Sequence, residues 1–316
     1  MATYQTYTAI GMREDLSDVI YNISPTDTPF FSSVGKTKAT AVLHEWQTDS
    51  LAAATLSNFA VEGDTASDAT MSPTTRVGNR CQIAQKTIKI SGTLQAVDKA
   101  GRKSEKAYQL AKASSEIKRD MEVSVLSNQI AANGNSTTAR KLGGLQAWLA
   151  TNGDFGVSGV AGANGTTART NGTNRTFTED ILKTVIREVY ASGGNPKVLM
   201  VNPAHKQLVS AFAGIAAQRF MAPANAPTTI IGAADVYLSD FGTVSVVPNR
   251  FMTSTNNCDD VAYVLDPDMA AIAYLRPFQT NELAVTGDNE STQLLAEYTL
   301  EVKNEAAHGI LADLTP

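Results

Sequence analysis

The chain has 316 residues, of which 43% are hydrophobic and 18% are charged, with a formal net charge of −5 and a pI of about 5.3. This length fits one large domain or two ordinary ones, and the hydrophobic fraction suffices for a real core. The acidic balance and the lack of a basic stripe exclude proteins that grip nucleic acid. The chain has few charged residues and many Ser, Thr, Asn, Ala and Gly residues. A polar but uncharged surface of this kind suits large, hydrated contacts between proteins.

The sequence gives no sign of export or of a membrane span. The opening residues, MATYQTYTAIGMRED, lack a basic segment followed by an apolar core, so we expect no secretory signal. The longest apolar run, Met269–Leu275, is far too short to cross a bilayer. We expect Cys81 and Cys258 to be reduced and unpaired, in a protein soluble in a cytoplasm.

Residues 1–35 predict an N-terminal arm. The apolar residues of 12–23 would share one side of a short helix, which Ser24-Pro25 ends. Phe30 and Phe31 follow a turn, and two adjacent phenylalanines need an apolar surface. That surface is either this chain's own core or another molecule.

The next segment predicts a long hairpin. Ala41–Thr48 and Arg80–Ser91 have strand patterns, and Asp49–Thr75 between them is rich in Ala, Ser, Thr and Asp. A two-stranded hairpin alone is marginal in water. We therefore expect it to find support on another surface, such as a second subunit, with its tip unpacked on its own core.

The stretch between Gly101 and Gly134 has no internal Gly or Pro and predicts one long helix. At about 1.5 Å per residue, this helix would span roughly 45 Å. Its apolar stripe is expected to pack under a sheet of the same subunit that includes Leu294–Val302. The stripe consists of Ala107, Leu110, Ser114, Ile117, Met121 and Val125.

Turn residues dominate the segment between Gly134 and Arg175, which contains four Asn-Gly pairs. Glycines also recur there at every third position, from Gly156 to Gly165. The run is too short and too poor in proline for a collagen helix. We expect an exposed loop.

A compact region of helices and strands follows. Thr176-Phe177-Thr178-Glu179 fits a capping box for a helix that Gly193-Gly194 ends, and Asn202-Pro203 starts a second helix that runs to about Phe212. Alternation in Leu294–Lys303 predicts a strand with one apolar and one wet face. The other expected strands are Val198–Val201, Val236–Leu238, Val244–Val247, Val261–Leu265, Ala270–Tyr274, Glu282–Val285 and Gly309–Leu311.

No set of residues in the sequence predicts catalysis. His44, His205 and His308 lie in separate segments without metal-ligand spacing, so structural or surface roles are expected. Asp259-Asp260 and Asp266-Pro267-Asp268 would suit a cation site, but turn chemistry explains them more simply. The G-x-S-x-G and glycine-rich phosphate-binding motifs do not occur. We expect no catalytic, cofactor-binding or metal site and no enzymatic activity.

The order of these parts resembles the major capsid proteins of tailed bacteriophages. DVIYNISPTDTPFFSSVGK is similar to the N-arm of that family, PKVLMVNPAHKQLVSAF to the strand-to-helix step of its axial domain, and YTLEVKNEAAHGIL to its closing strands. His44–Ser91 resembles its extended loop, and Gly101–Gly134 its spine helix. The resemblance covers nearly the whole chain and depends on the order of the parts, since no single motif decides it.

The resemblance implies an α+β fold of the Hong Kong 97 type. It implies an N-terminal arm over residues 1–35 and an extended loop over 36–98. The peripheral domain would comprise 99–142, with the spine helix, and 270–304. The axial domain would comprise 143–269 and 305–316. Some members of the family weld subunits through a Lys–Asn bond, and no such set can be matched in this sequence.

The implied function is self-assembly, as hexamers and pentamers, into the icosahedral shell that encloses the double-stranded DNA of a tailed phage. The protein would be a virion component assembled in the host bacterial cytoplasm, with portal, scaffolding or decoration proteins as partners. It would enclose DNA without specific binding and would not contact a membrane. The alternatives are an encapsulin-like cellular compartment, a tail-tube or decoration protein, and an enzyme with an unfamiliar site.

Overall fold

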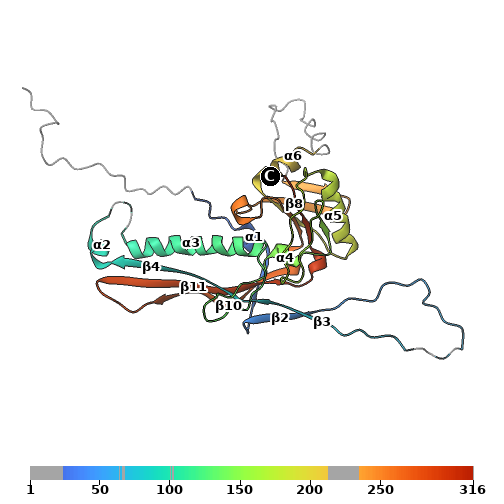
Figure 1. The fold of residues 1–316 in the computed structure, drawn as a ribbon, viewed down its shortest axis with the longest axis horizontal. Helices are drawn as coiled ribbons and strands as arrows, with labels where there is room; N and C mark the ends of the chain where they lie inside the picture. The colour runs from blue at the N-terminus through green and yellow to red at the C-terminus, as the bar shows by residue number, and fades with distance from the viewer. Residues whose placement is uncertain are drawn as a thin grey trace, which may run out of the picture.

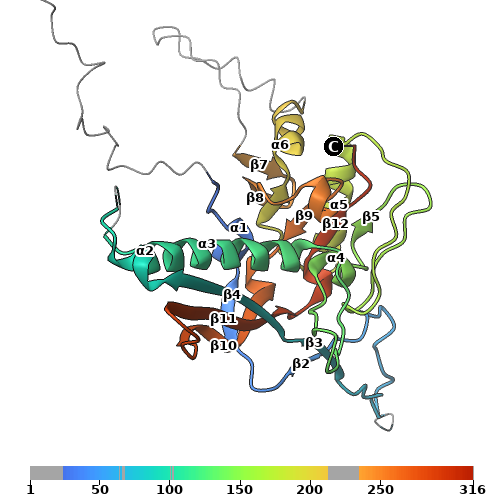
Figure 2. The ribbon, with the colours of Figure 1, turned by 60° about the vertical axis from the view of Figure 1, so that its left-hand side comes forward.

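The computed structural model describes residues 24–63, 65, 68–99, 101, 103–212 and 235–315. Two sheets organise this part of the chain (Figure 1). A four-stranded sheet packs against helix α3 (Glu105–Leu126), and a six-stranded sheet stands at the C-terminal end of that helix. A separate two-stranded hairpin projects away from both sheets (Figure 2). The helix predicted over 12–23 lies outside the described residues.

Helix α3 is the predicted long helix, but it is shorter than expected. It has 22 residues, or about 33 Å at 1.5 Å per residue, instead of the roughly 45 Å predicted from the distance between the two glycines. The Ser104 side chain caps its start by accepting a hydrogen bond from Ala107 N. The helix ends at Leu126, where Ser127 is extended, and beyond it the Asn128 side chain bonds both backbone groups of Arg169, at 2.7 and 2.8 Å.

The predicted apolar stripe of α3 packs on the four-stranded sheet from Leu110 to Val125, whereas Ala107 at its start is exposed. Ile117 and Met121 are buried, Leu110 is half-buried, and all three belong to one apolar cluster with residues of strand β11 (Asn289–Val302). The same cluster continues into the six-stranded sheet through Met200, Tyr263 and Ile310. Helix α3 therefore covers one sheet along its length and joins it to the other. The β11 members of the cluster are Leu294, Ala296, Tyr298, Leu300 and Val302.

The four-stranded sheet has the order β1–β10–β11–β4. Strand β1 (Gly35–Lys38) runs parallel to β10 (Ala270–Glu282), while β10 and β4 (Gln82–Ser91) both run antiparallel to β11. The strand expected at Ala270–Tyr274 continues as β10 to Glu282, with register shifts on both sides of Arg276. Pro277 follows this irregular point and cannot donate to a ladder. The separate strand expected at Glu282–Val285 is wrong, because residues 283–285 lie outside β10. Short helix α2 (Gly92–Ala96) follows β4.

The prediction of a wet face on β11 is wrong. Leu295, Glu297 and Thr299 alternate with the apolar residues, yet all three are buried. The Glu297 carboxylate accepts hydrogen bonds from Arg140 Nη2 at 2.5 Å and from Arg276 Nε at 2.7 Å. The residues of β11 do alternate, but groups from distant parts of the chain cover its polar side.

The predicted hairpin pairs differently from the expectation. Strand β2 (Leu43–Thr48) pairs antiparallel with β3 (Thr75–Arg80), whereas β4, the rest of the stretch read as one strand, belongs to the four-stranded sheet. Cys81 lies between β3 and β4, and its buried backbone N–H bonds Val42 O at 2.8 Å. The chain thus changes sheets at one residue, which periodicity cannot reveal.

The six-stranded sheet has the order β5–β12–β9–β6–β8–β7. One of its faces packs on helices α5 (Glu179–Ala191) and α6 (Pro203–Ser210). Thr178 caps α5, two residues later than the capping box implied, and Gly193 leaves the helix at φ +89°. Asn202 caps α6 as expected, and α6 ends at Ser210, before Phe212. The strands are β5 (Gly153–Asp154), β6 (Val198–Val201), β7 (Val236–Ser239), β8 (Gly242–Pro248), β9 (Ala262–Leu265) and β12 (Gly309–Leu311).

The glycine-rich segment is exposed at part of its residues, as expected, including Val157 and Val160, but other parts of it are packed. Short helix α4 (Leu145–Trp148) is buried, and so are Gly156, Gly162 and Gly165. Buried Arg169 donates to Asp313 Oδ1 at 2.8 Å and to Asp260 Oδ2 at 2.7 Å. The other oxygen of Asp313, Oδ2, accepts from Gly156 N at 2.9 Å, so this ion cluster ties the segment to the C-terminal residues.

We expect the Ile117→Ala substitution to lower the free energy of unfolding by roughly 2–4 kcal/mol, because it opens a cavity where α3 meets the sheet. Ile117 is 1% exposed. Denaturant unfolding of unassembled subunits measures this change. The control is Lys118→Glu, at the next position but exposed, with an expected cost below about 1 kcal/mol. Parent-like unfolding of Ile117→Ala would show that α3 does not support the core.

Candidate assembly surfaces

The base of the β2–β3 hairpin is fixed to the body of the subunit. Buried Asn79 donates to Gly143 O at 3.0 Å and to Leu300 O at 2.9 Å, and it accepts from Gly143 N at 2.8 Å. On the paired strand, His44 Nε2 lies 3.2 Å from Glu301 Oε2. Arg80 N also donates to Asn79 Oδ1, at 2.9 Å, so both donors and both acceptor positions of the Asn79 side chain are engaged, which sets the direction of the hairpin.

The segment that joins these two strands, residues 49–74 and here called the long loop, is uncovered by its own chain. Its described residues are all exposed, as predicted for an unpacked tip. It leaves the body beyond β2 and β3 in both views (Figures 1 and 2). Large apolar side chains in contact with water usually mark an interaction surface. They are Leu51, Leu56, Phe59, Val61 and Met71, with exposed fractions from 76 to 99%.

The arm is clamped to α3 by one buried acid. Glu122, fully buried, accepts hydrogen bonds from Phe30 N at 2.8 Å and from Phe31 N at 3.1 Å. These amides open helix α1 (Pro29–Ser33), whose N-cap Thr28 provides no side-chain bond. Asn249, after β8, donates a third bond at 2.7 Å. Burial raises the pKa of Glu122, and the three hydrogen bonds oppose that rise.

The two phenylalanines of the arm meet different surroundings. Phe30 is fully buried in the main cluster, so its apolar surface lies on this chain's own core. Phe31 is half-buried and makes an edge contact with Tyr298, with ring centroids 6.2 Å apart. Its remaining surface faces a groove.

This groove, here called the Phe31 groove, has a volume of about 830 Å³. The arm and α1 form one wall, α3 the second, and the irregular part of β10 the third. Aromatic rings line its interior, and two lysines lie at its sides. The lining residues are Thr28, Phe31, Ser32, Val34, Lys36, Lys118, Met121, Tyr274, Pro277 and Phe278.

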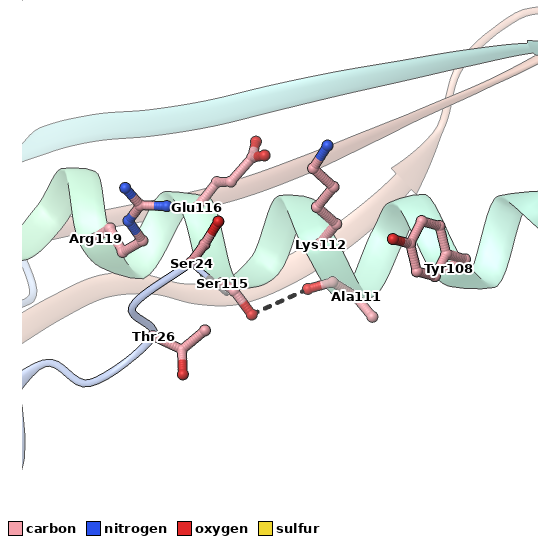
Figure 3. A pocket seen from close by; sticks show the side chains of 8 residues that line it. All are labelled: Ser24, Thr26, Tyr108, Ala111, Lys112, Ser115, Glu116 and Arg119. Atoms are coloured by element: carbon pink, nitrogen blue, oxygen red, sulfur yellow. Dashed lines mark hydrogen bonds between the residues drawn. The ribbon is translucent and has the colours of Figure 1, made fainter. Parts of the chain in front are cut away.

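A smaller and more polar groove, of about 380 Å³, follows the arm along α3. Figure 3 shows Ser24 and Thr26 of the arm beside the helix, with Ser115 Oγ donating to Ala111 O at 3.3 Å. None of the side chains that line it is buried. The arm therefore lies along this groove, and the groove has no enclosed polar group that would recognise a ligand. Its other lining residues are Tyr108, Lys112, Glu116 and Arg119.

Charge on α3 is unevenly distributed. Lys86 of β4 lies 2.8 Å from Glu116 and 3.5 Å from Asp120, which draws both acids toward the sheet. Burial opposes the charge on Lys86, but these partners outweigh it and raise its pKa, and the hydrogen bond from Lys86 lowers the pKa of Glu116. Lys112 and Lys118 are exposed, and the charge of Lys112 also helps to lower the pKa of Glu116. The groove beside the arm is lined by Lys112 and Arg119 together with Glu116, so its charge is mixed.

The predicted non-catalytic roles of the histidines fit their surroundings. Burial lowers the pKa of His205 and of His308, which favours neutral rings. His205 bonds Thr315 O at 3.0 Å, and His308 Nδ1 accepts from Asp266 N at 3.3 Å. His44 supports the hairpin, as described above. The three rings are not brought together.

The acidic pairs take part in turn and ion-pair chemistry. Asp266 accepts from Asp268 N at 3.3 Å and so caps a 3-10 turn (Pro267–Met269), and Asp268 pairs with Lys197. Asp260 belongs to the Arg169 cluster. In the part of the chain that the structure describes, no three His, Cys, Asp or Glu side chains are placed to hold a metal ion.

Both cysteines are free and buried, as expected. Burial raises the pKa of Cys81 to about 11 and that of Cys258 to about 12, which favours the neutral thiol at both positions. Within the described ranges, no helix combines the length and apolar character that crossing a bilayer requires.

Sequence reasoning found the long loop and the arm phenylalanines, but it missed Asn79, Glu122 and the lysines of the Phe31 groove. Glu122 had a readable signal, because it adjoins Met121 in the apolar stripe and a helix seldom buries an acid without a partner. Asn79 and Lys36 had none, since their roles depend on distant segments.

Comparison with known proteins gives one family for the chain. A family model described as SU10 major capsid protein matches residues 1–315. The major capsid protein of Escherichia phage Phieco32 is 29% identical over 354 aligned positions, which cover 98% of this chain and 96% of that protein.

Solved structures share the fold at much lower identity. The capsid of cyanophage A-1(L) is 11% identical with a TM-score of 0.66, covering 96% of this chain and 98% of its own. An encapsulin complex from Synechococcus elongatus is 12% identical with a TM-score of 0.56, covering 99% of this chain and 96% of its own. At such low sequence identity, the two comparisons show a shared fold and no shared function. The fold occurs both in a phage capsid and in an encapsulin.

We expect Glu122→Ala to lower the free energy of unfolding by about 2–4 kcal/mol, because three buried donors lose their acceptor. The arm amides of Phe30 and Phe31 should exchange hydrogen faster as the clamp opens. Denaturant unfolding and hydrogen exchange measure the two effects. Glu116→Ala, on the same helix but one third exposed, is the control and should cost below about 1 kcal/mol. Unchanged exchange at Phe30 and Phe31 would refute the clamp.

Proposed function

Because the chain belongs to the SU10 major capsid protein family, it is a phage major capsid protein, and we propose that its copies close into the icosahedral shell around the double-stranded DNA genome of a tailed phage. The fold is of the Hong Kong 97 type, as the sequence resemblance implied.

The observation that carries the shell contacts is the long loop on its fixed base. A loop with a fixed base and with apolar side chains 76 to 99% exposed is unsuited to an isolated monomer. In a closed assembly each copy both extends its loop and receives one, which is a heterologous contact. Many such contacts, repeated over a shell, add up to a stable particle.

The parts of the subunit have proposed roles in that shell. The arm (1–35) and the extended loop (36–98) would tie neighbours together. The peripheral domain (99–142 and 270–304) would form the wall. The axial domain (143–269 and 305–316) would gather in hexamers and pentamers. We infer a structural protein without enzymatic activity, assembled in the host bacterial cytoplasm, with portal, scaffolding or decoration proteins as further partners.

An encapsulin-like compartment is the second candidate, because a shell of that kind shares the fold. The two functions differ in what the particle holds. A phage head contains double-stranded DNA, whereas a cellular compartment contains protein. Family membership favours the phage head.

Electron microscopy of the purified protein tests the assembly. We expect closed shells with five-fold and six-fold clusters, and particles from the natural source should contain DNA. A subunit that stays monomeric under all conditions would refute the proposal, and particles filled with protein cargo would favour the compartment.

Replacing residues 49–74 by Asn-Gly should leave a folded, soluble subunit that forms no stable shells. Thr48 and Thr75 are directly paired, so a two-residue turn can close the shortened hairpin. Thermal unfolding and electron microscopy are the two measurements. A control with Ser at the five exposed apolar positions keeps the loop length and should fail in the same way. Normal shells from the shortened chain would contradict the role of the loop.

Purified subunits should not be retained on duplex DNA at physiological salt, because the chain has a net charge of −5. Retention on a DNA column across a salt series is the measurement. Tight retention that falls steeply with salt, with a slope equal to several phosphate contacts, would show that the lysines beside the arm bind DNA.

A further inference from the structure

The four Asn-Gly pairs of the sequence can undergo a chemical reaction that assembly does not involve. In such a pair, the backbone nitrogen of the glycine can attack the side-chain amide of the asparagine, because glycine has no side chain to hinder the approach. The reaction needs a glycine N–H that no acceptor holds and an asparagine side chain that is free to turn. The pairs begin at Asn133, Asn152, Asn164 and Asn171.

In the pair at Asn152, the asparagine side chain is held in place. Asn152 is 3% exposed, and its side chain donates to Ala306 O at 2.6 Å and accepts from Ser192 Oγ at 2.9 Å. These bonds must break before its amide carbon can turn toward the nitrogen of Gly153. Such a local opening of the structure has a free-energy cost, so the attack is slow in the folded chain.

In the next two pairs along the chain, the attacking nitrogen is held instead. Gly165 N donates to Ala147 O at 2.9 Å, and Gly172 N donates to Asp313 Oδ1 at 2.8 Å. A nitrogen whose proton lies in a hydrogen bond loses that proton less readily. The second acceptor is a carboxylate, whose negative charge opposes the loss further. Both asparagines are exposed, so exposure alone does not distinguish these protected pairs from a reactive one.

The pair Asn133-Gly134 has neither protection. It lies outside the helices and strands, and Asn133 is exposed. Among the described residues, neither the Asn133 side chain nor Gly134 N has a hydrogen-bond partner. The turn also requires glycine, because Gly134 has a φ of +68° and a Cβ atom there would lie 2.7 Å from Thr138 O and from Arg140 N.

We propose that Asn133 is a site of spontaneous deamidation in the folded subunit. The nitrogen of Gly134 gives up its proton and bonds to Cγ of Asn133, and the side-chain nitrogen takes a proton and leaves as ammonia. Water then adds to one of the two carbonyl carbons of the five-membered imide and breaks the bond from that carbon to the nitrogen. Addition at Cγ gives aspartate. Addition at the backbone carbonyl gives isoaspartate, in which the main chain continues through Cβ.

The surroundings of the site favour the product. Ala132 pairs with Lys141 through N–H···O bonds of 3.0 and 3.1 Å, one in each direction. This antiparallel register places position 133 opposite Arg140, and positive charge on both residues stabilises a new carboxylate. Each modified copy gains one negative charge there. The new charge competes with buried Glu297, which accepts a hydrogen bond from the Arg140 guanidinium.

Peptide mass spectrometry tests the site. The full chain is incubated under native conditions at mildly alkaline pH and digested at intervals, and methylation by an isoaspartyl methyltransferase identifies isoaspartate in each peptide. We expect deamidation at Asn133 at least about ten times faster than at Asn152, Asn164 or Asn171, because those three require local opening. In the chain unfolded in guanidinium chloride, the four rates should lie within about threefold of one another, because this protection is lost.

Matched variants connect the change of charge to the site. Asn133→Gln keeps an amide but would have to form a six-membered ring, so this chain should gain no acidic species on isoelectric focusing. Asn171→Gln, the control, should acidify like the parent. Equal rates at all four pairs in the folded chain, or an unmodified Asn133 after the unfolded chain has reacted, would overturn the proposal. The reaction needs only the folded subunit, so these outcomes do not depend on whether shells form.

Discussion

The packing of α3 on strand β11 is the contact on which the other parts depend. The helix places Ile117 and Met121 in the same cluster as Tyr298 and Leu300, and that cluster continues into the six-stranded sheet. Because one helix contributes to the core next to both sheets, the sheets share a core instead of forming two separate ones. The arm, both grooves and the base of the hairpin are all positioned relative to this helix and strand.

Buried polar groups fix the segments that the apolar core leaves undefined. Glu122 joins the arm, α3 and the residue after β8, Asn79 joins the hairpin to β11 and Gly143, and Arg169 joins the glycine-rich segment to Asp313. Each would be costly if one partner were missing, because a buried donor or acceptor would remain unpaired. Apolar packing tolerates sliding, whereas these bonds admit a single arrangement. These buried hydrogen bonds therefore fix the positions of the arm, the base of the hairpin and the glycine-rich segment relative to the core.

Local patterns in the sequence predicted the helices and strands, but they did not predict how distant segments pair. The α3 stripe, the caps of α5 and α6, and most strands follow from spacing within one segment. The change of sheet at Cys81 and the covered polar side of β11 depend on Val42, Arg140 and Arg276, which are far away in the sequence. Among the candidate assembly surfaces, the loop was predicted from its composition. The groove was not, because three separated segments form it.

The fixed base of the hairpin makes the long loop a lever. Half of residues 49–74 reaches at most about 43 Å at roughly 3.3 Å per residue, so a tilt of about 10° at the base moves the tip by about 7 Å. In the proposed shell, the angle at which each loop leaves its subunit would contribute to the angle between neighbours, and so to the curvature of the wall. The hydrogen bonds of Asn79 to Gly143 and Leu300, with the contact between His44 and Glu301, hold the base of the hairpin at that angle.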